Sequence, residues 1–81
     1  MRIHVKLFAV LRERAGIGDI MLDLPAGSDV ATASTRIARD YPKIGAMLPR
    51  VAYAVNQSYV PVSTALRDGD ELALIPPVSG G

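Results

Sequence analysis

Several residue types that build reactive or cross-linked sites are missing from this chain of 81 residues. Cysteine and tryptophan are absent, and phenylalanine occurs only once. Without cysteine, the chain can form no disulfide, no thiolate zinc site and no persulfide on a side chain of its own. Chemistry carried by this protein must therefore use a group other than a thiol.

An excess of charge of one sign and long hydrophobic runs are also absent. Nine basic and eight acidic side chains give a formal net charge of +1, so no electrostatic argument points to a nucleic acid or an anionic membrane as partner. The apolar runs are far shorter than the ~20 residues of a membrane-spanning helix. Residues 1–6 alternate in polarity, whereas a signal peptide has a continuous apolar stretch. We expect a cytoplasmic protein.

The N-terminal part of the chain shows the alternation that is typical of strands. In residues 2–8 every second residue is apolar, and residues 19–24 repeat this period of two, which predicts two half-buried strands. Between them, residues 9–15 form a helical turn or a loop that ends at Gly16.

One amphipathic helix is predicted in the middle of the chain. Ser28 or Asp29 can accept hydrogen bonds from the free N–H groups of a helix start, and apolar residues then recur at helical spacing from Val30 to Tyr41. Pro42 ends this helix, because proline disfavours the helical conformation in the residue before it.

The C-terminal half contains three further strand patterns. Residues 51–55 are apolar throughout, which indicates a strand covered on both faces, and residues 56–58 form a turn. Residues 59–62 allow a short edge strand that Pro61 interrupts. Residues 71–75 form the last strand after a turn at residues 68–70.

This order of elements predicts an α+β fold over residues 1–75. Two hairpin-like units that flank one helix can bury the apolar stripe of the helix against one face of a mixed sheet. We therefore expect a β-grasp domain with four to five strands packed on one main helix. The number of strands alone leaves other small α+β folds open.

The most specific segment is the tail, residues 76–81. Neither Pro76 nor Pro77 can donate to a sheet, so strand pairing should stop near Ile75 and an extended tail should follow. Gly80 and Gly81 carry no side chains and can enter a narrow channel. A terminal Gly-Gly alone is usually just a flexible end, but its place after a strand and a diproline favours a functional tail.

The group that such a tail presents is the carboxylate of Gly81. A carboxylate is a poor electrophile at neutral pH and must be activated before it is transferred, for example through adenylation by ATP. The acyl-adenylate can then accept sulfur to become a thiocarboxylate, or accept an amine or a thiol to become a conjugate. The tail suits each of these reactions.

Three groups of residues carry a resemblance to a known family. They are the C-terminal run of residues 68–73, 76–78 and 80–81, the segment Ala54 to Gln57, and the residues Phe8-Ala9, Leu11-Arg12-Glu13 and Gly16 after the first strand. Together they resemble the small subunit of molybdopterin synthase, a member of the ubiquitin-like sulfur carriers. The resemblance spans nearly the whole chain.

The resemblance implies a sulfur relay in molybdenum cofactor biosynthesis. A ubiquitin-activating-like adenylyltransferase adenylates Gly81 with ATP, and a sulfurtransferase system converts it to a thiocarboxylate. The tail then donates sulfur to cyclic pyranopterin monophosphate in the large synthase subunit. No cofactor is bound by the carrier, and two carriers join a large-subunit dimer in a heterotetramer. The catalytic side chains belong to the large subunit, so whether the carrier alone counts as an enzyme stays open.

The resemblance also implies which residues act. Gly81, with Gly80, is the reacting end. The residues expected to contact partners are Phe8, Arg12, Ile75, Pro76, Pro77, Val78 and Ser79. If Leu72 and Leu74 face the helix, Ile75 points away from it and is available to a partner. The family often has aromatic residues before the diproline, where this chain has Leu74-Ile75.

Other polar groups are better explained by structure than by chemistry. His4 should lie on the polar face of the first strand, and one histidine without clustered carboxylates makes no metal site. Asp68 and Asp70 flank Gly69, which favours turn hydrogen bonds over acid-base catalysis. The Ser34-Thr35 pair has no base nearby in the sequence.

Three alternatives to the molybdopterin carrier stay open. A sulfur carrier of the thiamine pathway shares the fold and the Gly-Gly end but usually lacks the Pro-Pro-Val run. A protein modifier would conjugate to lysines through Gly81. A plain interaction domain would have an inert tail.

Overall fold

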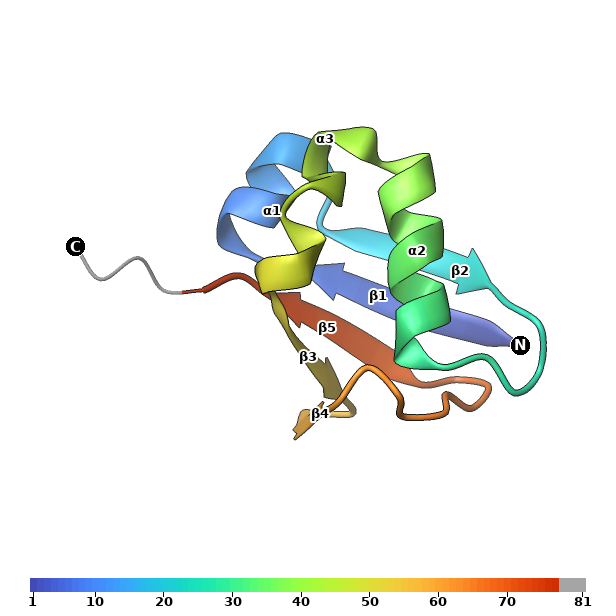
Figure 1. Ribbon diagram of the computed structural model, residues 1–81. Helices are drawn as coiled ribbons and strands as arrows, with labels where there is room; N and C mark the ends of the chain where they lie inside the picture. Colours follow the sequence, from blue (N-terminus) through green and yellow to red (C-terminus); the bar gives the residue numbers. More distant parts are fainter. Residues whose placement is uncertain (78–81) are drawn as a thin grey trace.

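Five strands form one mixed sheet, and the helices cover one of its faces (Figure 1). The computed structural model describes residues 1–77. The strand order is β2-β1-β5-β3-β4, with β1 and β5 parallel and all other neighbours antiparallel. This arrangement confirms the predicted α+β β-grasp fold. The elements are β1 Arg2–Leu7, α1 Ala9–Ala15, β2 Asp19–Asp23, α2 Val30–Asp40, α3 Pro42–Gly45, the 3-10 helix η1 Leu48–Arg50, β3 Ala52–Val55, β4 Ser58–Val60 and β5 Glu71–Ile75.

The core lies between α2 and the sheet. Val30, Ala33 and Ile37 form the buried stripe of α2, at the helical spacing that the sequence shows. The sheet buries every second residue of β1, β2 and β5 toward this stripe. The core is almost entirely aliphatic, and Tyr53 is its one aromatic member within residues 1–77. The alternation that predicted the strands therefore also defines the inner face of the sheet.

The structure adds helical segments that the sequence did not reveal. Residues 9–15 form a helix, α1, where a helical turn or a loop was expected. Pro42 ends α2, as predicted, but it also begins α3, in whose first turn its missing N–H costs nothing. Ile44 of α3 and Leu48 of η1 are buried in the core. These short helices therefore form because tertiary packing holds them.

The β3 strand is covered less completely than predicted. Tyr53 faces the helices and Ala54 faces the other side of the sheet, and both are buried. Ala52, however, is exposed. The prediction of burial on both faces is therefore correct only for the middle of the strand.

The turn between β3 and β4 depends on Asn56 and Gln57. Their φ angles are +48° and +72°, the successive left-handed conformations of a two-residue type I′ hairpin turn. The Asn56 side chain also ties this turn to β5. Its Nδ2 donates to Asp70 Oδ1 at 2.9 Å, and its Oδ1 accepts from the Glu71 N–H at 3.0 Å. Asn56 therefore joins two parts of the sheet.

The substitution Asn56→Ala is expected to lower the free energy of unfolding by about 2 kcal/mol. Two hydrogen bonds at about 1 kcal/mol each are lost, and alanine tolerates the left-handed conformation less well than asparagine. Urea unfolding followed by circular dichroism measures the change. The matched control is Gln57→Ala, which keeps both hydrogen bonds. An equal loss in the two variants would show that the Asn56 side chain contributes nothing beyond the turn.

The start of α2 is capped by Asp29. Its Oδ1 accepts hydrogen bonds from the backbone N–H and from Oγ1 of Thr32, each at 2.8 Å. The backbone hydrogen bond is the main cause, and the side-chain hydrogen bond the second, of a pKa of Asp29 below its ordinary value of 3.8. The sequence left Ser28 and Asp29 open as caps, and the structure selects Asp29.

This cap makes part of the stability dependent on pH. Because the pKa of Asp29 is lower in the folded protein than in the unfolded chain, its contribution is complete above about pH 4 and is lost as the pH falls through the folded value. Asp29→Asn caps the helix without titrating. We expect the stability advantage of the natural protein over Asp29→Asn to be constant from pH 7 to pH 5 and to shrink by pH 3. Urea unfolding at each pH tests this, and an unchanged difference at pH 3 would contradict it.

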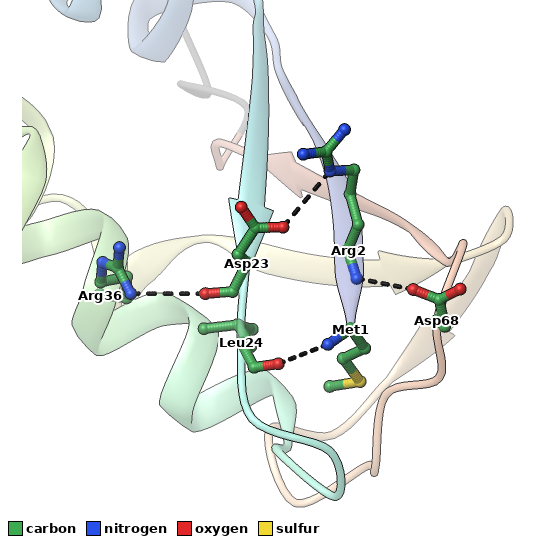
Figure 2. Close-up of polar contacts among 6 residues, drawn as sticks. All are labelled: Met1, Arg2, Asp23, Leu24, Arg36 and Asp68. Atoms are coloured by element: carbon green, nitrogen blue, oxygen red, sulfur yellow. Dashed lines mark hydrogen bonds and ion pairs between the residues drawn. The ribbon is translucent and has the colours of Figure 1, made fainter.

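Polar contacts fasten the start of β1 to its neighbours. Figure 2 shows the Met1 nitrogen donating to the Leu24 carbonyl oxygen at 2.7 Å and the Arg2 N–H donating to Asp68 Oδ1 at 2.7 Å. The Arg2 Nε also lies 3.3 Å from Asp23 Oδ1. Because β1 and β5 are parallel, these contacts lie at the end of the sheet opposite the last residue of β5.

Candidate functional site

The root of the tail is the C-terminal end of a central strand. β5 ends at Ile75, as predicted, and lies between β1 and β3. Pro76 and Pro77 follow outside the sheet, while the predicted site residues Val78, Ser79, Gly80 and Gly81 lie outside the described residues. Because β1 runs parallel to β5 and leads directly into α1, the root of the tail and α1 lie at the same edge of the domain (Figure 1).

The side chains of β5 divide between the two faces of the sheet. Leu72 and Leu74 are completely buried against the helices. Glu71, Ala73 and Ile75 point to the opposite face, which no helix covers, and are partly exposed. The predicted orientation of Ile75 is therefore confirmed, and the last residue of the strand is open to a partner.

An apolar surface surrounds the root of the tail on this uncovered face. Phe8, Ala54, Tyr59, Ala73 and Ile75 line a shallow hollow. We call these five residues the docking surface. Phe8 and Tyr59 are 45% and 72% exposed, which is unusual for large aromatic side chains in a domain of this size. The arrangement leaves apolar area available for contact directly beside the tail.

The backbone around Phe8 explains why this side chain is not in the core. Leu7 is the last residue of β1 and faces inward, so Phe8 points to the uncovered face. The chain then turns into α1 at Ala9, whose φ of +48° is rare for a residue with a side chain. Phe8 is thus held at the edge of the sheet, beside the end of β5.

Sequence reasoning found Phe8 and Ile75 but missed Tyr59 and Ala73. Tyr59 belongs to β4 and lies opposite Ala54 of β3, which in turn lies opposite Ala73 of β5. This row across three strands depends on the register of the sheet. The one signal in the sequence is that Ala73 shares the parity of Ile75.

The rest of the uncovered face is charged and internally paired. His4 Nε2 lies 2.7 Å from Asp19 Oδ1, and Lys6 Nζ lies 3.6 Å from Glu71 Oε1. Exposed pairs of this kind contribute about 0–1 kcal/mol each. His4 lies on the polar face, as predicted, and residues 1–77 contain no group of three or more potential metal ligands. The charged half therefore borders the docking surface and forms no metal site.

Arg12 lies on α1, one helical turn after Phe8. Its side chain is exposed and rests against Gly18, the residue before β2. Arg12 is absent from the hollow that defines the docking surface, but it lies on the helix that begins beside this hollow. The structure thus brings the two predicted partner residues Phe8 and Arg12 to one edge of the domain.

The polar residues that the sequence set aside all have structural roles. Asp70 accepts from the Arg67 N–H at 2.7 Å, within the turn before β5, as predicted. Ser34 Oγ lies 2.6 Å from the Tyr53 hydroxyl, and Thr35 Oγ1 donates to the Ala31 carbonyl oxygen. These side chains hold the fold together, so the described residues direct attention back to the tail and the docking surface.

No helix within residues 1–77 combines the length and the hydrophobicity that a membrane span requires.

Together, the fold and the exposed apolar surface at the root of the tail define a ubiquitin-like protein of the β-grasp class. The chain belongs to the ThiS family, whose model matches residues 5–81. Curated relatives carry the name that the sequence motifs suggest. The molybdopterin synthase sulfur carrier subunit of Chlamydomonas reinhardtii is 37% identical, with all of both chains covered. That of Mycobacterium tuberculosis is 35% identical, with all of this chain and 99% of the relative covered.

Solved structures confirm the fold. SAMP1 from Haloferax volcanii is 29% identical, with all of both chains covered and a TM-score of 0.92. The putative molybdopterin converting factor subunit 1 from Pyrococcus furiosus is 30% identical, with 96% of this chain and 99% of that chain covered and a TM-score of 0.88. The complex of subunits 1 and 2 of the molybdopterin-converting factor from Helicobacter pylori contains a chain of the same fold. That chain is 24% identical, with both chains fully covered and a TM-score of 0.72.

Proposed function

We propose that this protein is the sulfur carrier subunit of a molybdopterin synthase and that Gly81 is its working residue. The observation that carries the proposal is the similarity over the full chain to proteins named molybdopterin synthase sulfur carrier subunit. The position of the tail supports it, because the last strand ends directly before Pro76 and beside an exposed apolar surface.

The proposed chemistry takes place at the terminal carboxylate. ATP converts the carboxylate to an acyl-adenylate and releases pyrophosphate. A C–S bond then forms at the same carbon, the bond to the phosphate oxygen breaks and AMP leaves, so that a thiocarboxylate remains. The thiocarboxylate donates its sulfur to cyclic pyranopterin monophosphate to build the dithiolene. This chain is the co-substrate in that step, while the catalytic side chains belong to the large subunit.

The docking surface is suited to partners that must grip the domain while they work on its tail. We propose three such partners: the large synthase subunit, an adenylyltransferase of the ubiquitin-activating type and a sulfurtransferase. The Helicobacter protein is named as a complex of subunits 1 and 2, which supports the first. We further propose a heterotetramer of two carriers on a large-subunit dimer, acting in the cytoplasm, where ATP is available to the activating enzyme.

Mass spectrometry of the intact protein from its native cell tests the proposal. A sulfur carrier is expected to contain a fraction in which one terminal oxygen is replaced by sulfur, and fragmentation is expected to place that sulfur on Gly81. Detection of the unmodified carboxylate alone, from cells grown with ample sulfur, would argue against any sulfur carrier. Formation of dithiolene from the thiocarboxylated protein, the large subunit and the pterin precursor then tests the pathway.

A second candidate function is that of a protein modifier. The observation that favours it is the close structural similarity to Haloferax volcanii SAMP1, described in a second structure as small archaeal modifier protein 1. A modifier forms an amide bond between Gly81 and a lysine of another protein. Tryptic digests of the native cell lysate would then contain lysines that carry the C-terminal residues of this chain. Their presence without any thiocarboxylate would favour this candidate over sulfur transfer.

A further inference from the structure

The side chain of Arg12 lies directly on the backbone of Gly18. A methyl group built on Gly18 would lie 3.1 Å from Arg12 Nε, 3.3 Å from Cδ and 3.4 Å from Cζ. All three distances are tighter than an ordinary contact between carbon atoms, at about 3.5–4.0 Å. The guanidinium group therefore occupies the space that any side chain at position 18 would take.

Gly18 is needed for this space and not for an unusual backbone conformation. The glycines with positive φ in the described chain are Gly16, Gly27 and Gly69. Gly18 is not among them, so other residues can adopt its backbone conformation without strain. Its carbonyl oxygen accepts a hydrogen bond from the Leu7 N–H at 2.8 Å, which fixes it to the end of β1. Gly18 is thus a fixed and flat support under Arg12.

The support matters because Arg12 has no carboxylate to hold it. Within residues 1–77 its guanidinium group forms no ion pair, whereas Arg2, Arg36 and Arg39 each do. An exposed arginine normally samples many rotamers, and holding it in one costs up to about 2 kcal/mol. Contact with Gly18 restricts the side chain in the free protein, so less of this cost remains when a partner binds.

We propose that Gly18 is a positioning residue that holds Arg12 ready for the partner that binds beside the tail. This inference rests on the proposed function, since Arg12 and Phe8 lie at the edge from which the tail leaves. The partner meets an arginine in one orientation, next to an exposed aromatic side chain. A residue larger than glycine at position 18 moves the arginine away and leaves the fold intact.

Substitutions of Gly18 in two backgrounds test this role. Gly18→Val and Gly18→Ala are made in the natural protein and in Arg12→Ala, and calorimetry measures the affinity for the large synthase subunit. We expect Gly18→Val to weaken binding roughly tenfold, about as much as Arg12→Ala does, and Gly18→Ala to weaken it less. In the Arg12→Ala background, neither substitution should weaken binding further. Thermal unfolding should stay unchanged in all variants, because the contact is with the flexible end of an exposed side chain.

Two controls make the outcome specific. Gly45→Ala places a methyl group 3.4 Å from the Ala38 carbonyl oxygen on α2, outside the docking surface, and should leave affinity unchanged. In NMR spectra, a nuclear Overhauser effect between the Arg12 Nε–H and the Gly18 Hα should be present in the natural protein and absent in Gly18→Val.

Natural affinity in Gly18→Val, or an equal loss in both backgrounds, would overturn the positioning role while the proposed function stands. A natural protein that shows the Overhauser effect but does not bind the large subunit would contradict the proposed function and, with it, the docking role of Gly18.

Discussion

A variant that carries one extra alanine after Gly81 is expected to lose sulfur transfer completely and to unfold at the same temperature as the natural protein. The proposed chemistry takes place at the carboxylate of Gly81, which becomes an internal amide in this variant. An amide has no carboxylate oxygen that can attack ATP, so no acyl-adenylate forms. The folded domain should not change, because β5 ends at Ile75, six residues before the addition.

Dithiolene formation in a mixture of the carrier, its activating enzyme, a sulfur donor and the large subunit measures the effect. The control is Ser79→Ala, which alters the tail but keeps Gly81 as the last residue. The mass of the extended protein is determined before and after the reaction, so that removal of the added residue is detected. Activity from a carrier that still carries the alanine would contradict the mechanism.

The second large effect is expected from two neighbouring residues of β5 that face opposite sides of the sheet. Leu74 is completely buried among the helices, and Ile75 lies on the docking surface. Leu74→Ala should lower the free energy of unfolding by about 2–5 kcal/mol, because it leaves a cavity in the core. A domain of this size has only about 5–15 kcal/mol to lose.

Ile75→Ala should leave stability almost unchanged and weaken binding of the large subunit at least tenfold. Ile75 lies at the centre of the exposed hollow, next to the tail, where buried apolar contacts contribute most to affinity. Urea unfolding and calorimetric titration of both variants measure the two quantities. If Ile75→Ala were the less stable of the two, or if only Leu74→Ala lost affinity, the assignment of faces would be wrong.

The sequence was sufficient for the main elements of the fold because their signals are local. Period-two alternation placed β1, β2 and β5, and the helical stripe that starts at Val30 placed α2. α3 and η1 could not be predicted in the same way. Pro42, Gly45 and Pro49 look like helix breakers within a short segment, and its helical turns exist only because Ile44 and Leu48 pack into the core.

The candidate site was predictable only where it depends on the parity of a single strand. That parity correctly placed Ile75 on the uncovered face. Tyr59 enters the docking surface because the β3–β4 hairpin brings it opposite Ala54, and no local pattern encodes this register. The contact of Arg12 with Gly18 likewise joins a helix to the loop after it through side-chain packing, which spacing along the chain does not reveal.

The position of β5 also affects how the domain responds when its tail is pulled. β5 has hydrogen-bonded neighbours on both sides, β1 in the same direction and β3 in the opposite one. A force applied along the tail acts parallel to β5 and loads both ladders in shear, so that their hydrogen bonds must yield together. An enzyme that tugs on the last residues to draw them into its active site therefore pulls against the strongest direction of the sheet, and the domain can be handled by its tail without unravelling.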